Sequence, residues 1–131
     1  MNHRECFEYF ECTPTNIRWS WTAKNVRTKT VVLTCWADGF ANGVYRRIHT
    51  TSGHGYKELI RDIRYAQEHC DGILHVIMAK AKNPHEHPRK IEWCEPRDMQ
   101  MKIISFNETT GELVAKPVEV LLAHTREAVT S

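Results

Sequence analysis

RWSWTAKNVRTKTVVLTCW, residues 18–36, holds three of the four tryptophans of this 131-residue chain and four of its positive charges. Counting from the preceding Ile17, apolar side chains occupy every second position as far as Trp21. This period is typical of a half-buried strand, here over residues 17–23. Because side chains two apart on a strand point the same way, we expect Trp19 and Trp21 to share one face.

The rest of the segment predicts a turn followed by a second strand. The run KNVRTK at 24–29 is polar, and TVVLTCW at 30–36 is rich in β-branched residues. Because this apolar run is continuous rather than alternating, we expect a central strand that is covered on both faces. The two strands would form a hairpin whose tip carries Lys24, Arg27 and Lys29.

The clearest helix of the chain is predicted after this hairpin. Residues 56–70 place apolar side chains at helical spacing, with charged side chains between them. Hydroxyls and glycines precede this stripe, as capping groups do, and Asp71 followed by Gly72 is typical of a helix end. One long amphipathic helix is therefore expected in the middle of the chain.

Short strands are expected on both sides of this helix. They lie at residues 44–50, 73–81 and 91–96 and in a hairpin over 99–120. Residues 1–13 are expected to form a short N-terminal helix or arm, and residues 124–131 a frayed tail.

About six strands and one long helix make an α+β fold. Hairpin connections favour a mixed or mainly antiparallel sheet, and so many strands in a short chain favour a curved sheet or an open β-barrel. The sequence has no internal repeat and no long linker. Residues 1–131 are therefore predicted to form a single domain.

Composition and cysteine usage indicate a folded protein of a reducing compartment. Hydrophobic residues at 41% and charged residues at 26% are ordinary for a globular domain. No apolar run approaches the roughly 20 residues that span a bilayer, and the acidic N-terminus is unlike a signal peptide. Five cysteines are an odd number and form no C-x-x-C pair, which favours free thiols. We expect a cytoplasmic protein without a membrane partner.

Charge is distributed unevenly along the chain. Residues 14–66 hold nine Lys and Arg against three Asp and Glu, a net of +6. Residues 1–13 and 67–131 each carry a net of −2. A basic middle between acidic ends indicates a polyanion partner, and the alternative is an ordinary solvated surface.

Aromatic residues gather around the expected hairpin and are candidates for a ligand pocket. They are Trp19, Trp21, Trp36 and Tyr45. Aromatic rings stack on nucleic-acid bases, and neighbouring cations hold phosphates. The alternative is that these rings fill the core, as most tryptophans on a half-buried strand do.

The stretch YRRIHTTSGHG, residues 45–55, runs straight into the expected helix start. Backbone N–H groups at a helix N-terminus bind phosphate readily, so Arg46, Arg47 and Ser52 join the hairpin cations as phosphate candidates. The glycine spacing does not match a P-loop, which argues against nucleotide hydrolysis. An ordinary capped loop is the alternative.

Neither a metal centre nor a catalytic centre is predicted. The loop NPHEHPRK places His85 and His87 two apart, but the second half of a zinc pattern is missing from the sequence. No nucleophile signature surrounds any serine or cysteine. We therefore predict no metal, no cofactor and no catalytic residue, and an enzymatic activity is not favoured.

Three stretches carry a resemblance to a known superfamily. They are WSW with Trp19 and Trp21, TCWADGF with Trp36 and Asp38, and the strand GILHVIMAKA after the helix. In layout the chain resembles the PUA-like superfamily, with EVE and YTH-type modules the most similar.

This resemblance implies a small curved barrel that holds a flipped-out or single-stranded base, often a modified one, in an aromatic pocket. Trp21 and Trp36 would be pocket walls, and Asp38 would contact the base edge. Cations of the hairpin and of the third strand would hold the backbone; they are Lys24, Arg27, Arg46 and Arg47.

Three functions follow from these patterns. The leading hypothesis is a nucleic-acid-binding module that reads a flipped or modified base of DNA or RNA without catalysis. The first alternative is a protein or enzyme that binds a small anionic ligand through Arg46 and Arg47. The second alternative is a protein-interaction domain of a larger system, which predicts an exposed apolar patch.

Overall fold

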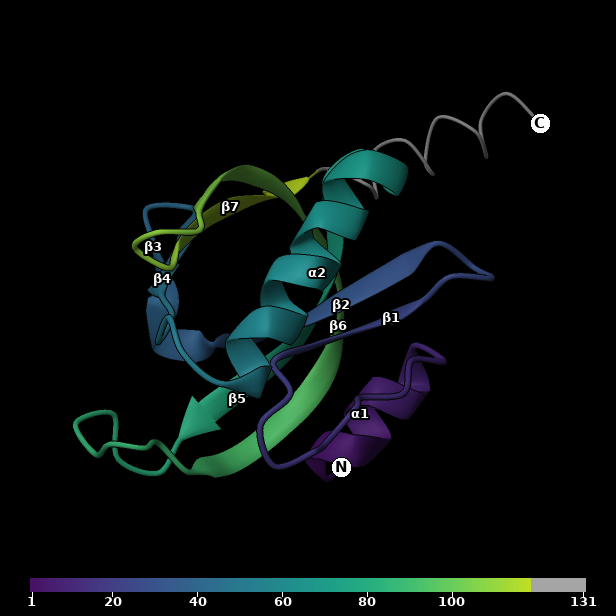
Figure 1. Ribbon diagram of the computed structural model, residues 1–131. Helices are drawn as coiled ribbons and strands as arrows, with labels where there is room; N and C mark the ends of the chain where they lie inside the picture. The colour runs from purple at the N-terminus through teal and green to yellow at the C-terminus, as the bar shows by residue number, and fades with distance from the viewer. Residues whose placement is uncertain (119–131) are drawn as a thin grey trace, which may run out of the picture.

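Residues 1–118 are described by the computed structural model and form two α-helices and one mixed sheet of seven strands (Figure 1). The tail expected at 124–131 lies outside the described residues. Along the chain the elements are α1 (His3–Tyr9), β1 (Thr22–Asn25), β2 (Thr30–Trp36), the 3₁₀ turn η1 (Ala37–Gly39), β3 (Phe40–Ala41), β4 (Val44–Ile48), α2 (His54–His69), β5 (Ile73–Ala81), β6 (Ile91–Asn107) and β7 (Glu112–Val118).

The strands lie side by side in the order β1-β2-β5-β6-β7-β4-β3. Strands β2 and β5 are parallel, and every other neighbouring pair in this order is antiparallel. A parallel pair needs a crossover connection, and α2 belongs to the connection between β2 and β5. The α+β class and the mixed sheet are as predicted.

The sheet curves but does not close (Figure 1). Its edges β1 and β3 each have a single paired neighbour among residues 1–118. The predicted barrel is therefore not confirmed, and the sheet has seven strands rather than about six. Two helices are present, α2 with 16 residues and α1 with 7.

Strand β2 lies inside the sheet and is covered on both faces, as its continuous apolar run predicts. Val31, Leu33 and Cys35 belong to the core cluster under α2. Val32 and Trp36 point to the opposite face and belong to a second cluster. The protein therefore has a helix packed against each side of its central strands.

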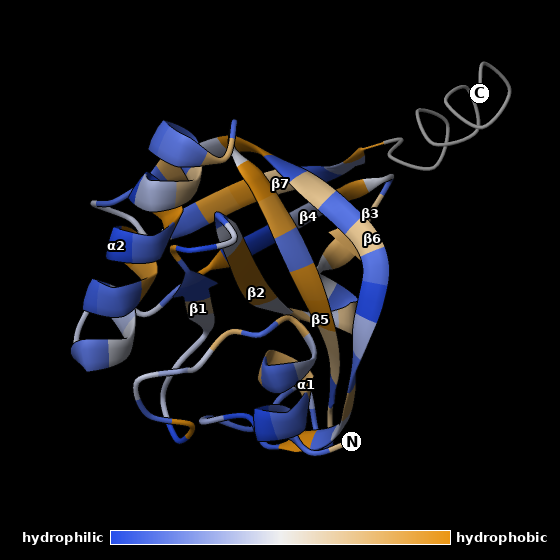
Figure 2. Ribbon diagram, turned by 90° about the vertical axis from the view of Figure 1, so that its right-hand side faces the viewer, coloured by the Kyte–Doolittle hydropathy of each residue, from blue (hydrophilic) through white to orange (hydrophobic). Residues whose placement is uncertain are grey.

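Each helix packs through a short apolar stripe. Helix α2 contributes Tyr56, Leu59, Ile63 and Ala66 to the first cluster. Its other side is polar and faces away from the sheet (Figure 2). Helix α1 contributes Cys6 and Phe7 to the second cluster. It begins at a capping box in which Asn2 and Glu5 satisfy each other's backbone N–H groups.

The strand predicted over residues 17–23 is wrong for most of its length, because β1 begins only at Thr22. The Asn16 side chain accepts a hydrogen bond from the Arg18 N–H at 2.9 Å. The backbone carbonyl of Asn16 accepts a second one from the Ser20 N–H, also at 2.9 Å. These bonds fold the segment into a turn, although its apolar and polar residues alternate in sequence as they do in a half-buried strand. Trp19 and Trp21 therefore do not share a strand face.

The two segments predicted at 91–96 and from 99 onward are one long bent strand, β6. Pro96 lies inside it, although proline cannot donate to a strand ladder. Strand β7 pairs with β6 only from Gln100 onward, so Pro96 has a paired neighbour on one side alone among the described residues. A register shift between His75 and Val76 of β5 accommodates the bend.

None of the helices within residues 1–118 combines the length and the apolar character that a membrane crossing requires.

Candidate functional site

Three tryptophans meet at one cavity. Trp36 is the last residue of β2, Trp21 directly precedes β1, and Trp19 lies in the turn before it. Together they line a cavity of about 430 Å³, here called the tryptophan cavity. The ring centroids of Trp21 and Trp36 are 5.7 Å apart at an interplanar angle of 65°. The pocket lies at the carboxyl end of β2.

The charged side chains that line this cavity are all cationic. They are Arg18, Arg47, Arg89 and Lys90. No carboxylate lines the cavity among the described residues. The cations come from the turn before β1, from β4 and from the loop between β5 and β6. Clustered charge of one sign in a concave site attracts an anionic ligand.

Arg89 is held over the rim of the tryptophan cavity. Its guanidinium lies 5.2 Å from the ring centroid of Trp36. It also donates two hydrogen bonds to the Asp38 carboxylate, at 2.8 and 2.9 Å. The hydrogen bonds from Arg89 hold the pKa of Asp38 below its usual value, so Asp38 is ionised at neutral pH.

Several buried donors at the cavity have no hydrogen-bond partner within residues 1–118. They are Trp36 Nε1, Arg47 Nε and Arg89 Nε. A buried donor without a partner costs about 1–3 kcal/mol. Indole and guanidinium N–H groups only donate. A ligand that satisfies them must therefore present acceptor atoms.

A second cavity, here called the helix cavity, opens at the N-terminus of α2 and has a volume of about 320 Å³. It shares four lining residues with the tryptophan cavity, namely Arg18, Trp19, Trp21 and Thr50. The two cavities therefore adjoin at residues 17–21, here called the tryptophan turn, and together they are here called the groove.

His49 forms part of the wall of the helix cavity. It is 6% exposed, and its ring centroid lies 6.1 Å from that of Trp21. Burial, with the nearby charge of Arg47, lowers the pKa of His49 to about 4. The ring is therefore neutral at neutral pH, and its buried Nε2 has no partner within the described part of the chain.

The structure gathers most of the predicted pocket residues. Trp19, Trp21, Trp36 and Arg47 line the tryptophan cavity, and Ser52 lines the helix cavity. Asp38 lies in an adjoining hollow of about 340 Å³ and contacts the tryptophan cavity through Arg89. Residues distant in sequence thus converge where the sequence predicts a pocket.

Two predicted residues of this region lie elsewhere. Tyr45 is fully buried in the core under α2, and its hydroxyl accepts a hydrogen bond from the Trp36 N–H at 3.2 Å. Tyr45 therefore does not line the cavity but holds the end of β2 through this hydrogen bond. Arg46 is exposed, pairs with Glu112 at 3.0 Å, and lines the hollow that contains Asp38.

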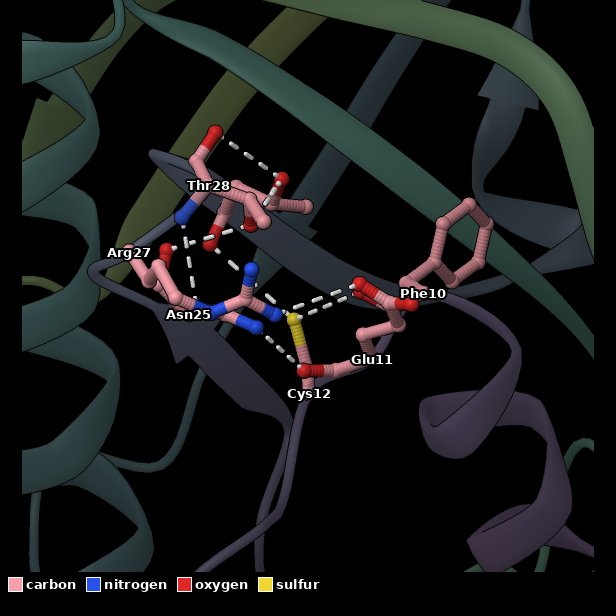
Figure 3. A network of polar contacts seen from close by, with 7 residues as sticks. Phe10, Glu11, Cys12, Asn25, Arg27 and Thr28 are labelled. Atoms are coloured by element: carbon pink, nitrogen blue, oxygen red, sulfur yellow. Dashed lines mark hydrogen bonds and ion pairs between the residues drawn. The ribbon is translucent and has the colours of Figure 1, made fainter.

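The hairpin cations are not next to the tryptophan cavity. Lys24 lies 2.9 Å from the buried carboxylate of Asp62 and so ties β1 to α2. Arg27 points toward Glu11 in the loop after α1 (Figure 3), at a distance of 3.7 Å. The carbonyl of Lys29 accepts a hydrogen bond from Cys70 at the end of α2.

The hairpin tip therefore lies at the C-terminal end of α2, whereas the helix cavity lies at the N-terminal end. A helix of 16 residues is about 24 Å long, so the hairpin tip at Lys29 is about a helix length from the helix cavity, whereas Lys24 lies beside Asp62 in the middle of the helix. A ligand in the tryptophan cavity reaches the hairpin cations only if it is as long as an oligonucleotide.

Sequence reasoning missed three cations and one histidine of the groove, namely Arg18, Arg89, Lys90 and His49. Arg89 and Lys90 lie in the NPHEHPRK loop, whose pattern points only to the two histidines as candidate metal ligands. The β5–β6 hairpin brings that loop to Trp36, and no local pattern marks such a contact. His49 lies within the strand predicted at 44–50 but directly follows the observed β4, and its burial has no signal in the sequence.

The buried cysteines of the protein are not activated as nucleophiles. Burial raises the pKa of the Cys6 thiol to about 12 and that of Cys12 to about 11, and raises that of Cys35. Such thiols are protonated at neutral pH and react poorly. Within residues 1–118, no three His, Cys, Asp or Glu side chains are grouped as a metal site.

No protein-family model, curated protein or solved structure matches this chain. The resemblance to the PUA-like superfamily therefore stays a prediction.

Proposed function

We propose that the protein binds nucleic acid by accepting one base in the tryptophan cavity. One observation carries this proposal: three tryptophans converge on a cavity of about 430 Å³ whose charged lining residues are all cationic. Aromatic faces stack on bases, and cations neutralise the phosphates that accompany them. A neutral apolar ligand would leave the cations of this pocket unused.

The energies are compatible with base extrusion. Stacking on aromatic side chains contributes about 1–3 kcal/mol per base, and unstacking a base from a duplex costs about the same few kcal/mol. The cations at the cavity then supply the net affinity through phosphate contacts. Binding should therefore weaken steeply with salt, and single strands should bind more tightly than duplexes.

The first experiment measures binding by fluorescence anisotropy. Short single- and double-stranded DNA and RNA, with plain and methylated bases, are titrated at two salt concentrations. Salt-sensitive affinity that also depends on the base supports the proposal. Absence of binding at low salt contradicts it.

Trp19→Ala is the variant that tests the cavity. Trp19 is half-buried, so its truncation should leave the protein folded while lowering oligonucleotide affinity about tenfold or more. Trp93→Ala is the matched control, because Trp93 is 40% exposed on β6 and does not line the cavity. Equal affinity of the two variants would contradict a role for the cavity.

A small anionic ligand is the second candidate, favoured by the buried unpartnered donors Trp36 Nε1, Arg47 Nε and Arg89 Nε. Buried donors on three residues that line one cavity suit a compact molecule with several acceptors. Tryptophan fluorescence distinguishes the two functions: quenching by mononucleotides or small carboxylates, without oligonucleotide binding, selects this second candidate.

A further inference from the structure

The N-terminus of α2 has backbone donors without partners. The N–H groups of His54, Gly55 and Tyr56 make no hydrogen bond to any residue within 1–118. The N-cap residue is Gly53, which has no side chain to cap the helix, and the first turn contains no acidic residue. Helix α1 differs, because its capping box closes its own N-terminus. Uncapped N–H groups at the positive end of a helix bind anions.

A second observation points to a ligand at the same place. His49 is more than nine-tenths buried, lines the helix cavity, and has no partner for its Nε2 within the described chain. In the tautomer with its proton on Nε2, this residue of the cavity wall carries a hydrogen-bond donor without an acceptor. Because His49 precedes α2 by several residues, this donor is independent of the helix end.

The remaining polar lining of the helix cavity is cationic or neutral. Arg18, Thr50, Ser52 and His54 line it, and no carboxylate does so among the residues described. Donors from a helix end, a buried imidazole and a guanidinium together match the three acceptor oxygens of a phosphate group.

Gly55 keeps this helix end next to the tryptophan turn. A Cβ atom at this position would lie 2.6 Å from the carbonyl oxygen of Trp19, so only glycine allows the turn to pack so closely. Trp19 and Trp21 consequently form a wall that both cavities share. A phosphate at the helix end and a ring in the tryptophan cavity can belong to one nucleotide.

We propose that the helix cavity is a phosphate subsite that holds the phosphate of the nucleotide whose base occupies the tryptophan cavity. This inference rests on the proposed function for the identity of the whole ligand. The phosphate subsite itself rests on the α2 end and His49 alone. In this arrangement, the sugar that joins base and phosphate lies against Trp19 and Trp21, the wall between the two cavities.

The test is an amide NMR titration with three probes: inorganic phosphate, a nucleoside and the matching nucleoside monophosphate. Inorganic phosphate should shift the amide signals of His54, Gly55 and Tyr56. The monophosphate should also shift the indole signals and bind at least about tenfold more tightly than the nucleoside. Unchanged amide signals with both phosphate-bearing probes would overturn the inference.

Ser52→Asp provides the matched variant. It places a negative charge at the cavity on an exposed residue, so the fold is kept while the monophosphate loses its advantage over the nucleoside. Thr28→Asp makes the same charge change at the exposed hairpin tip, a helix length away, and should keep that advantage. Equal behaviour of the two variants would overturn the inference.

The two proposals fail in different ways. Amide shifts with inorganic phosphate, without any oligonucleotide binding at the tryptophans, support the subsite and contradict base binding. Oligonucleotide binding that depends on Trp19, without amide shifts at the start of α2, supports base binding and overturns the subsite.

Discussion

Trp36 belongs to the core and to the cavity wall at the same time. It is 2% exposed and packs in the second core cluster, under α1. Its side chain also lines the tryptophan cavity, and the Arg89 guanidinium lies over its ring. The two hypotheses for this residue, core or pocket, are therefore not exclusive. Variants of Trp36 must be chosen so that stability and binding are separated.

Trp36→Ala should lower the free energy of unfolding by about 3–5 kcal/mol, because it removes a buried ring and leaves a cavity. Chemical denaturation measures this loss. Trp36→Phe is the matched variant: it keeps a ring but removes the unpartnered indole N–H, so it should lose less stability. A loss below about 1 kcal/mol for the alanine variant, as for a surface substitution, would contradict the core role.

Among the single residues of the site, those of a rare type were the most readily predicted from the sequence. Trp19, Trp21 and Trp36 attract attention because tryptophans are few and lie close together in sequence. Arg89 and Lys90 resemble any loop cation, and only the folded β5–β6 hairpin places them beside Trp36. Residue type therefore predicted the rings, whereas three of the four cations of the tryptophan cavity were missed.

At the scale of elements, Gly55→Ala tests whether α2 and the tryptophan turn form one unit. Alanine favours a helix by about 1 kcal/mol over glycine, yet its Cβ would lie 2.6 Å from the Trp19 carbonyl oxygen. We expect the clash to dominate, with a net loss of about 1–3 kcal/mol and weaker ligand binding.

Thermal unfolding and the anisotropy titration measure the two effects of Gly55→Ala. Gln67→Ala is the control, because Gln67 is exposed on the same helix and its replacement should change neither quantity. A variant more stable than the parent protein would show that the turn moves away from α2 at little cost.

Strands with a continuous apolar run and the helix with a regular apolar stripe were predicted to within two residues of their observed ends. The ranges 30–36 and 73–81 match β2 and β5, and the predicted helix differs from α2 by two residues or fewer at each end. The prediction failed at residues 17–21, where one asparagine side chain organises a turn. A side-chain hydrogen bond of this kind leaves the apolar period unchanged, so periodicity alone cannot detect it.

At the scale of the whole molecule, the pairing of β2 with β5 is the feature that sequence patterns could not predict. Three elements and a turn separate the two strands, and nothing local selects a parallel partner. This pairing nevertheless builds the groove, since it places the end of β2 beside the loop that follows β5. The groove is therefore a product of topology, although most of its aromatic residues come from one short segment.

Stability should depend on pH through buried histidines. Burial lowers the pKa of His3 and His49 to about 4, and it lowers that of His75 as well. Between the ordinary value of 6.5 and about 4, the unfolded chain binds protons that the folded chain does not. The free energy of unfolding is therefore highest above this window and falls as the pH falls through it, by about 1.4 kcal/mol per pH unit for each fully buried ring.

Urea unfolding at neutral pH and at two acidic values above pH 4 measures this slope. His3 is partly exposed, so its share should be smaller than that of His49. His3→Gln should reduce the slope, whereas His85→Gln should leave it unchanged, because His85 is exposed in the loop after β5. A stability that stays constant from neutral pH to the lower end of the window would mean that the histidines titrate in the folded protein as they do in the unfolded chain. The lowered pKa of the buried His49 would then be wrong.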